Sequence, residues 1–249
     1  GHELTKRFGV DGLPESTIDI NLTGSAGQSL GAFVPKGISI KVVGDVNDYL
    51  GKGLSGGVLS VRPFESSQYE SHESVIAGNV IGYGATSGKI FVSGVVGERF
   101  LVRNSGAIAV VEGVGDHALE YMTGGEAVIL GNTGINVGAG MSGGIGYFYK
   151  LNAERVNEQA IASGELLIQG LSEFDQQRLQ KILQEYVDYT GSKIATEMLK
   201  NFDQEKQNFQ KLVPSDYARV LEIRTEAMQT GADPDGSETW TKILEVTNG

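Results

Sequence analysis

Several short stretches of this chain carry residue types at spacings that catalytic sites use. Gly53-Leu-Ser-Gly-Gly57 and Gly140-Met-Ser-Gly-Gly144 both fit G-x-S-x-G, the turn that presents a nucleophilic serine in many hydrolases. An enzyme of that class needs one such turn and a histidine base. This chain has two copies, each directly before an apolar run, and His72 and His117 are the only candidate bases. The duplication favours a structural repeat over a catalytic serine.

Two glycine patterns resemble dinucleotide-binding loops. Gly113-Val-Gly-Asp-His-Ala118 fits G-x-G-x-x-A, and Gly138-Ala-Gly-Met-Ser-Gly143 fits G-x-G-x-x-G. A dinucleotide fold continues the loop into a helix and places an acidic residue about 20 positions later, at the end of a strand. Here the next apolar run after the first pattern, Ala127–Leu130, is followed by Gly131-Asn132. Both patterns therefore favour turns, and we expect no cofactor site in this chain.

Two further candidates concern phosphate and metal ions. Gly44–Lys52 ends in Gly-Lys as a P-loop does, but its spacing is too long and Gly53 stands where Ser or Thr is needed. His117 with Asp116 and Glu120 could hold a metal, although one histidine and two carboxylates close in sequence make a poor site. We expect neither catalytic nor metal-binding residues. An independent enzyme that uses His117, Asp116 and Glu120 remains the competing hypothesis.

The stretches that carry these motifs belong to a regular alternation of apolar runs and glycine clusters. Runs that begin at residues 89, 107, 127 and 145 are spaced by 18, 20 and 18 residues. A repeat of this length must be weighed before any single motif, because it changes what each motif means. The segments between the runs contain Gly, Asn and Ser where a helix would need Ala, Leu and Glu, so a βαβ array is disfavoured.

A parallel β-helix with three short strands in each rung fits the repeat. At about 3.3 Å per residue, 18–20 residues close one rung. Run centres near residues 19, 40, 59, 76, 91, 109, 128 and 147 predict about seven to eight rungs. Glycine suits the corners because it tolerates a positive φ and a close backbone approach. The expected turn glycines are Gly24, Gly27, Gly31, Gly94, Gly97, Gly113, Gly131, Gly134 and Gly138.

The earlier part of the chain fits the same scheme less regularly. The alternation of Thr17–Leu22 predicts a half-buried strand, and Ile38–Val43 and Gly56–Val61 predict two more. Residues 64–74 are polar and predict a surface insertion, and Val75–Gly78 predicts a weak fourth strand.

Composition changes near Lys150. Residues 1–149 hold 30 of the 36 glycines, which predicts a β-helix over 1–149 and a helical tail over 150–249 that caps or packs on it. The tail is expected to contain helices at 172–191, 192–202 and 206–213 and a fourth that opens at Ser215. The first has Ser172 and Asp175 as a capping box and ends at Gly191. Residues 228–240 are expected to be loose, and the end beyond them partly disordered.

Charge and composition limit the partners. The formal net charge of −11 is spread evenly over the chain, without a basic patch to neutralise phosphates, so we expect no nucleic-acid partner. Apolar runs stay far below about 18 residues, which argues against a membrane span. The chain has no Cys, so it carries no disulfide and no Cys-ligated iron–sulfur cluster. A cytoplasmic location is the default expectation. The Gly1-His2 start suggests a piece of a larger protein.

Glycine and apolar residues are enough to build a rung, so the charged and aromatic residues among the rungs need another explanation. They can pair as a surface ladder or contact a partner. The residues expected at a domain interface are Glu98, Arg99, Arg103, Asn104, Glu112, Asp116, His117, Glu120 and Tyr121.

Long irregular strings stand out beside the repeat. They include Gly44-Asp-Val-Asn-Asp-Tyr-Leu-Gly-Lys-Gly-Leu-Ser-Gly-Gly57, Val111-Glu-Gly-Val-Gly-Asp-His117, Leu130-Gly-Asn-Thr-Gly134 and Thr190-Gly-Ser192. These strings resemble a known family, the carboxy-terminal GXGXG domain of the glutamate synthase large (alpha) subunit. The resemblance covers most of residues 17–221. It implies a right-handed parallel β-helix, in agreement with the repeat.

The resemblance also implies a function. The parent enzymes convert glutamine and 2-oxoglutarate into two glutamates, using a Cys glutaminase (amidotransferase) domain, an FMN domain with an iron–sulfur cluster, and an ammonia tunnel between them. This chain would be a structural scaffold that spaces those two domains in an oxidoreductase of nitrogen assimilation. The alternative is a separate, non-catalytic assembly subunit of a glutamate synthase-like or formylmethanofuran dehydrogenase-like complex. The sequence does not decide whether ferredoxin or a nicotinamide donates the electrons.

Overall fold

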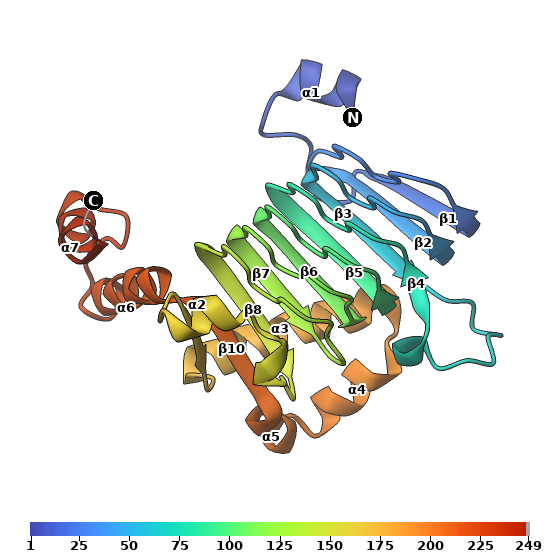
Figure 1. The fold of residues 1–249 in the computed structure, drawn as a ribbon. Coiled ribbons are helices and arrows are strands. Elements are labelled where there is room, and N and C mark those ends of the chain that lie inside the picture. Colours follow the sequence, from blue (N-terminus) through green and yellow to red (C-terminus); the bar gives the residue numbers. More distant parts are fainter. Residues whose placement is uncertain (248–249) are drawn as a thin grey trace.

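The structure, a computed structural model, describes residues 1–247 and shows a β-solenoid with helices packed along one side (Figure 1). The strands are β1 Ile18–Ala26, β2 Ile38–Val46, β3 Ser55–Arg62, β4 Val75–Ala77, β5 Ser87–Val96, β6 Ser105–Gly113, β7 Thr123–Ile129, β8 Gly143–Tyr149, β9 Leu166–Gln169 and β10 Phe209–Pro214. The α-helices are α1 His2–Phe8, α2 Glu158–Ala162, α3 Glu173–Thr190, α4 Lys193–Lys200, α5 Phe202–Glu205, α6 Ser215–Gln229 and α7 Ser237–Thr247.

The solenoid has about seven rungs, which confirms the predicted fold class. The strands β1, β2, β3, β5, β6, β7 and β8 pair in parallel, in that order. β3 and β4 belong to one rung, because β4 pairs with the same neighbours, β2 and β5. The predicted fourth strand is therefore the continuation of the third, and the polar residues 64–74 leave the rung and return to it.

The sequence predicted three short strands in each rung, and this expectation was wrong. The third rung contains β3 and the short β4, and each of the other rungs contains one long strand. The rest of the rung is a corner segment in which every second residue has a positive φ, which a strand does not allow. In the fourth of the seven rungs, for example, Arg99, Leu101 and Arg103 have φ of 61°, 57° and 57°. Because every second residue has a positive φ, the segment contains no run of consecutive extended residues that could form a strand.

The corner segments nevertheless form a second ladder of backbone hydrogen bonds. The middle left-handed residue donates its N–H to the preceding rung, as Leu101 does to Ile81 O at 2.8 Å. The two outer ones donate to the following rung, as Arg99 does to Asp116 O at 2.8 Å and Arg103 to Glu120 O at 3.0 Å. Consecutive rungs are therefore joined by backbone hydrogen bonds along the strands and along the corners.

The apolar side chains of the strands alternate between the solenoid interior and the outer face of the sheet. In β5, Ile90 and Val92 belong to the interior cluster, whereas Phe91 belongs to a second cluster under the helices. Strands apolar on both faces read as continuous apolar runs, which is why the later rungs gave the clearest repeat. β1 alternates because helix α3 does not cover it, and its outer residues are exposed.

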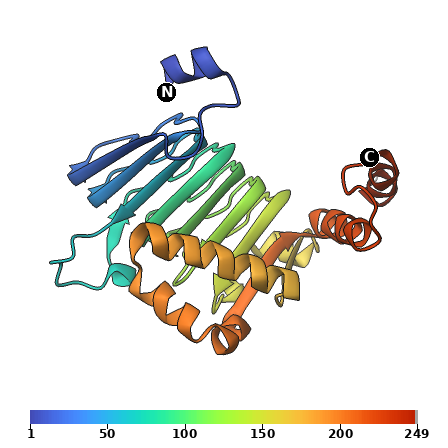
Figure 2. The same cartoon turned by 180° about the vertical axis from the view of Figure 1, so that it is seen from behind.

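Helix α3 runs along the outer face of the sheet (Figure 2). Its predicted capping box is confirmed: Ser172 Oγ accepts from Asp175 N at 3.1 Å, and the helix ends at Gly191 with φ 67°. Its buried residues Leu179, Ile182 and Leu183 pack on the strands. Helix α4 follows with Ser192 as its N-cap, close to the predicted 192–202.

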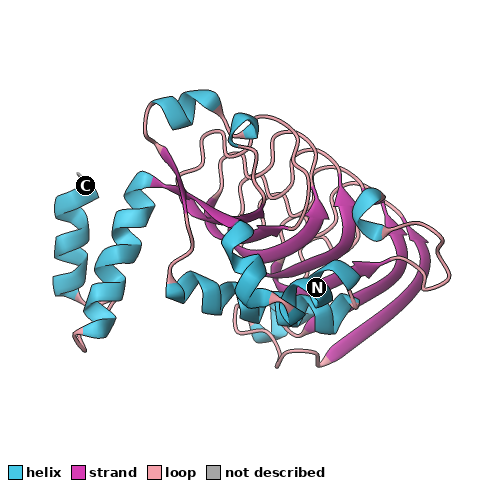
Figure 3. Cartoon of the chain, turned by 90° about the horizontal axis from the view of Figure 1, so that it is seen from below, coloured by secondary structure: helices cyan, strands magenta, loops and turns pink. Residues whose placement is uncertain are grey.

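One expectation for the tail was wrong. Residues 206–213 were predicted to be a helix, but Phe209–Pro214 is strand β10, which pairs antiparallel with β8 and then with β9. The open edge of β8 offers hydrogen bonds that outweigh a weak local helix preference. Of residues 228–240, expected to be loose, the first two belong to α6 and the last four to α7, whose Ile243 is buried where α7 packs on α6. In Figure 3 this helical pair extends away from the solenoid. Partial disorder beyond residue 240 stays a prediction.

Candidate domain interface

The outer left-handed positions of the corner segments form a surface along the solenoid, which we call the corner face. From the first rung to the sixth it consists of Ser29, Phe33, Tyr49, Gly53, Val80, Gly84, Arg99, Arg103, His117, Tyr121, Asn136 and Gly140, all with positive φ. Four of the nine predicted interface residues, Arg99, Arg103, His117 and Tyr121, lie on it. Glu98, Asp116 and Glu120 each precede one of its residues.

The conformation of the corner face is unfavourable for most of the residues that occupy it. A left-handed conformation costs a non-glycine residue roughly 1–2 kcal/mol. At the middle position the cost is offset by burial, since Leu101 and Leu119 are fully buried in the core. At the outer positions Phe33 is 63% exposed and Tyr121 56% exposed, and both arginines are exposed. These side chains gain little within the chain in return for the strain.

Two aromatic side chains of the corner face, Phe33 and Tyr121, lie over glycines of the following rung. A Cβ on Gly53 would lie 2.4 Å from Phe33 Cε1, and one on Gly140 would lie 2.5 Å from Tyr121 Cε1. Exposed aromatic rings and arginines are the residue types enriched at protein–protein contacts. The arginine side chains of the corner face have no hydrogen bond or ion pair within residues 1–247. Together with the strained backbone and the exposed aromatic rings, they mark the corner face as a candidate contact surface.

The predicted turn glycines beside this face have two different roles. Gly31 and Gly138 have positive φ within corner segments, as predicted. Gly24 and Gly94 also have positive φ, but they lie inside strands β1 and β5, so they are not turn glycines. Gly97 and Gly134 do not have positive φ; their missing Cβ makes room for a side chain of the preceding rung. Asn79 Oδ1 and Asp116 Oδ1 would lie 2.1 and 2.2 Å from a Cβ at Gly97 and Gly134. Each of these oxygens accepts the next backbone N–H, Glu98 N at 2.9 Å and Ile135 N at 2.8 Å.

The other predicted glycines divide in the same way. A Cβ at Gly131 would lie 2.3 Å from Glu112 O, so close packing explains why this residue is glycine. A Cβ at Gly113 would lie 3.1 Å from Val95 Cγ2, which is a tight contact and agrees with the same explanation. Gly27 has neither a positive φ nor a neighbour within 4 Å of a built Cβ. Its expected role as a turn glycine is therefore wrong.

Two predicted interface residues are buried, so the interface prediction is wrong for them. Asn104 is fully buried and closes its own turn: its Nδ2 donates to Ala107 O and its Oδ1 accepts from Ala107 N, both at 2.9 Å. Glu112 is 1% exposed. A polar residue in a strand that is otherwise apolar was read from the sequence as a surface residue, but its partners come from distant parts of the chain.

The carboxylate of Glu112 joins the helices to the solenoid. It accepts hydrogen bonds from the hydroxyls of Ser71 at 2.6 Å, Ser93 at 3.2 Å and Ser192 at 2.5 Å. Tyr186 Oη lies 3.0 Å from both Glu112 Oε1 and Val92 O and can donate to one of them at a time. Burial first, and the adjacent Glu112 second, raise the pKa of Tyr186 well above its ordinary value. The hydroxyls come from the 64–74 insertion, β5, α3 and the turn before α4.

Ion pairs flank this contact along α3. Arg178 makes a forked contact with Glu126 of β7, with Nε 3.0 Å from each carboxylate oxygen. Lys89 of β5 pairs with Glu185, and Lys211 of β10 pairs with the buried Asp175 at 2.8 Å. Burial alone would raise the pKa of Asp175, but hydrogen bonds from Lys211 and Ser172 outweigh burial and hold the pKa below its ordinary value. The helix is therefore held on the sheet by apolar, ionic and hydrogen-bonded contacts.

The motifs that imitate catalytic sites are parts of the solenoid. Each G-x-S-x-G stretch leads from a corner into a strand, β3 or β8, where a nucleophile elbow would lead into a helix. The Gly113–Ala118 pattern leads into a corner segment. His117 Nδ1 lies 2.9 Å from Asn136 Nδ2 of the next rung. Within residues 1–247 no group of three or more His, Asp or Glu residues is arranged to hold a metal ion.

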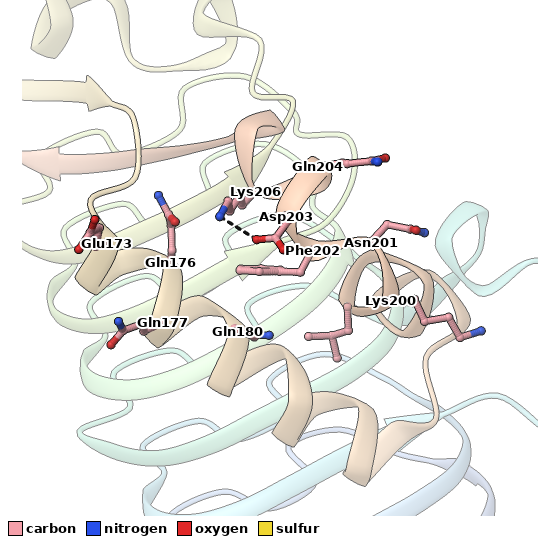
Figure 4. Close-up of a pocket in the computed structure, with 11 residues that line it drawn as sticks. Glu173, Gln176, Gln177, Gln180, Lys200, Asn201, Phe202, Asp203, Gln204 and Lys206 are labelled. Atoms are coloured by element: carbon pink, nitrogen blue, oxygen red, sulfur yellow. Dashed lines mark hydrogen bonds and ion pairs between the residues drawn. The ribbon is translucent and has the colours of Figure 1, made fainter.

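A polar groove of about 620 Å³ lies between α3 and the α4–α5 corner (Figure 4). Amide side chains dominate its walls, among them Gln176, Gln177 and Gln180, and Lys206 pairs with Asp203 at 2.9 Å. The residues that line it include no pair of nucleophile and base, so it offers no site for the chemistry considered above. Among the helices of residues 1–247, none combines the length and the apolar character that a membrane span requires.

Comparison with known proteins gives a matching family and several relatives of this chain. The family described as GXGXG motif matches residues 1–215. A Schizosaccharomyces pombe protein named glutamate synthase [NADH] is 48% identical over 224 residues, which are 89% of this chain and 10% of that protein. The Bacillus subtilis glutamate synthase [NADPH] large chain is 45% identical over 231 residues, which are 93% of this chain and 15% of that protein. A ferredoxin-dependent glutamate synthase of Pyropia yezoensis is 41% identical over 222 residues, which are 88% of this chain and 14% of that protein. The chain thus spans 10 to 15% of the length of these three relatives.

Proposed function

We propose, from the premise that this chain belongs to the GXGXG family of glutamate synthase large chains, that it is the structural scaffold of such an enzyme. The enzyme would convert glutamine and 2-oxoglutarate into two glutamates, with ammonia passing between a glutaminase domain and an FMN domain. This chain has no Cys, so it supplies neither a Cys nucleophile nor Cys ligands for an iron–sulfur cluster. Both functions would belong to parts of the enzyme outside these residues.

The observation that carries the proposal is the double ladder of the solenoid. Seven parallel strands stacked at about 4.8 Å give a sheet about 29 Å long. The corner segments add a second row of backbone hydrogen bonds on the other side of each rung. A rod that is bonded along two sides resists bending, and ammonia transfer requires two catalytic domains to stay in register. The scaffold would supply that fixed separation.

The corner face is the proposed contact between the scaffold and the catalytic domains. Its exposed Phe33, Arg99, Arg103 and Tyr121 occupy positions where glycine would be less strained. Contact with another domain would bury the aromatic rings and pair the guanidinium groups, which offsets the backbone strain.

The test uses the complete glutamate synthase that carries this chain. Tyr121→Gly with Arg103→Gly removes two contact side chains and keeps the backbone bonds of the corner, since Gly53, Gly84 and Gly140 already occupy the third corner position in other rungs. We expect more glutamine to be hydrolysed per 2-oxoglutarate converted, because ammonia escapes from loosened domains. Gln177→Ala, on an exposed helix position, is the matched control.

Two results would contradict the scaffold. One is an unchanged ratio of glutamine consumed to 2-oxoglutarate converted in the double variant. The other is catalysis by this chain alone: release of ammonia from glutamine, or binding of FMN with a visible spectrum. The alternative, an assembly subunit on a separate polypeptide, differs from the scaffold in gene organisation, because it would be encoded apart from the catalytic domains.

A further inference from the structure

The two ends of the solenoid differ in how they are covered. At the C-terminal end, β10 pairs with β8 and β9 pairs with β10, so the last rung is followed by two further strands. At the N-terminal end, β1 has a single neighbour, β2, within residues 1–247. Helix α1 covers only part of this end, where its Leu4 is buried against the core. In Figures 1 and 2 no strand lies beyond β1.

The outward edge of β1 carries a row of unpaired backbone groups. Ile18 N donates to Gly37 O, and Ala26 O accepts from Asn47 N, so the even-numbered residues of β1 face β2. In a parallel ladder successive residues face opposite sides. The N–H and C=O groups of Asp19, Asn21, Thr23 and Ser25 therefore point away from the sheet, without a backbone partner in the described chain.

The side chains of β1 are also incompletely buried. Ile20 is 38% exposed, whereas the residues stacked on it in the next rungs, Ile40, Leu59 and Ile90, are 8%, 1% and 0% exposed. Ile18 is 42% exposed. The inward-facing column is thus apolar up to its last member, which lacks a rung above it.

The edge also lacks the features with which proteins protect a free strand. Natural edge strands carry Lys, Pro, bulges or inward-pointing charges that discourage pairing. β1 has no Lys and no Pro, one charged residue (Asp19), and nine consecutive residues in regular register with β2. An unprotected, regular edge above an apolar column is the form expected of a strand that is paired in the complete protein.

We propose that β1 pairs with a strand of the same glutamate synthase polypeptide from outside residues 1–249, by β-strand addition. This rests on the proposed function, in which the chain is one part of a longer enzyme, and this chain matches only 10% and 15% of the two relatives, which therefore have further segments. The added strand would alternate apolar side chains over Ile18, Ile20 and Leu22. A second copy of the chain is disfavoured, because pairing two chains of net charge −11 edge to edge brings like charges together.

Hydrogen exchange in the complete enzyme tests this pairing. The amides of Asp19, Asn21, Thr23 and Ser25 are expected to exchange at least about 100-fold more slowly than unprotected amides, like the amides of Ile20 and Leu22 that face β2. The protection should be independent of enzyme concentration. Fast exchange of the outward amides beside slow exchange of the inward ones would overturn the proposal. Protection that grows with enzyme concentration would assign the edge to a second copy and overturn it as well.

A pair of variants separates the added strand from other causes of protection. Asn21→Pro removes one outward N–H, which a bare edge strand tolerates. If the edge is paired, exchange at Asp19 and Thr23 should accelerate by at least about tenfold, with the inward amides unchanged. Asn21→Ala keeps the N–H and should change neither. Equal behaviour of the two variants would count against pairing. The scaffold proposal is judged on ammonia escape, so either proposal can fail without the other.

Discussion

Replacing Arg103 by glycine should leave this chain as stable as before or make it more stable, although glycine usually destabilises ordered structure. Arg103 has φ 57° and an exposed side chain, and its backbone N–H donates to Glu120 O at 3.0 Å, which glycine can also do. The equivalent corner position is already glycine in Gly53, Gly84 and Gly140. The backbone of the corner therefore accepts glycine without rearrangement.

Two opposing terms set the magnitude. Relief of the left-handed conformation favours Arg103→Gly by roughly 1–2 kcal/mol. The additional freedom of glycine in the unfolded chain opposes it by about 0.5–1 kcal/mol. The expected net change lies between zero and a gain of about 1.5 kcal/mol in the free energy of unfolding. Thr123→Gly is the matched control, because Thr123 is exposed on β7 with an ordinary φ, so only the unfavourable term applies and about 1 kcal/mol should be lost.

Urea unfolding followed by far-ultraviolet circular dichroism measures both variants. The single tryptophan, Trp240, lies in α7 away from the rungs, so its fluorescence would report on the wrong part of the chain. The two midpoints should move in opposite directions with equal m-values. Arg103→Gly could instead lower the free energy of unfolding as much as Thr123→Gly does. In that case the backbone at Arg103 is not strained, and the argument that strain marks the corner face as a contact surface fails.

Three more perturbations test separate parts of the structure. Gly134→Val should destabilise the fold by more than about 2 kcal/mol, because its Cβ would lie 2.2 Å from Asp116 Oδ1. The control Gly27→Ala, with open space around the new methyl group, should leave the thermal midpoint within a few degrees. Equal shifts of the thermal midpoint in the two variants would refute the argument. Glu112→Leu leaves the hydroxyls of Ser71, Ser93 and Ser192 without their acceptor, while Tyr186 keeps Val92 O, and it should cost about 3 kcal/mol or more, with faster amide exchange around Ser192. An unchanged thermal midpoint would contradict the joining role of Glu112. The pKa of Asp175 is lower in the folded chain than its unfolded value of about 3.9, so its contribution to stability is present above that value and is lost as pH falls through the folded pKa. Asp175→Asn should therefore weaken the loss of stability at acid pH, measured by urea unfolding at several pH values. An unchanged loss of stability at acid pH would contradict this role of Asp175.

The repeat could be read from the sequence because each rung must solve the same local problem. Glycines at Gly31 and Gly138 satisfy a positive φ, and apolar runs such as Lys89–Ser93 supply residues for both faces of a strand. These requirements are local and recur at a nearly fixed step. The fold class, the number of rungs and the capping box of α3 were therefore predictable, as was family membership from the longer strings.

The corner conformation was not predictable in the same way. A left-handed residue is ordinarily expected at glycine, yet Arg99, Arg103, His117 and Tyr121 adopt it because the hydrogen bonds of the adjacent rungs impose the same backbone on every rung. Their role as candidate contact residues was inferred from residue type alone. The physical reason, strain without burial, became visible only in the assembled solenoid.

Pairing across long sequence distances decided the remaining features. Phe209–Pro214 became a strand because the edge of β8 was available, and Glu112 became buried because Ser71, Tyr186 and Ser192 converge on it from 41, 74 and 80 residues away. Such contacts have no local signature, since each partner is an ordinary polar or apolar residue in its own segment. The sequence by itself therefore determined the rung, its period and its family. Only the tertiary structure decided which polar side chains turn inward to hold the helices and which remain exposed on a strained backbone.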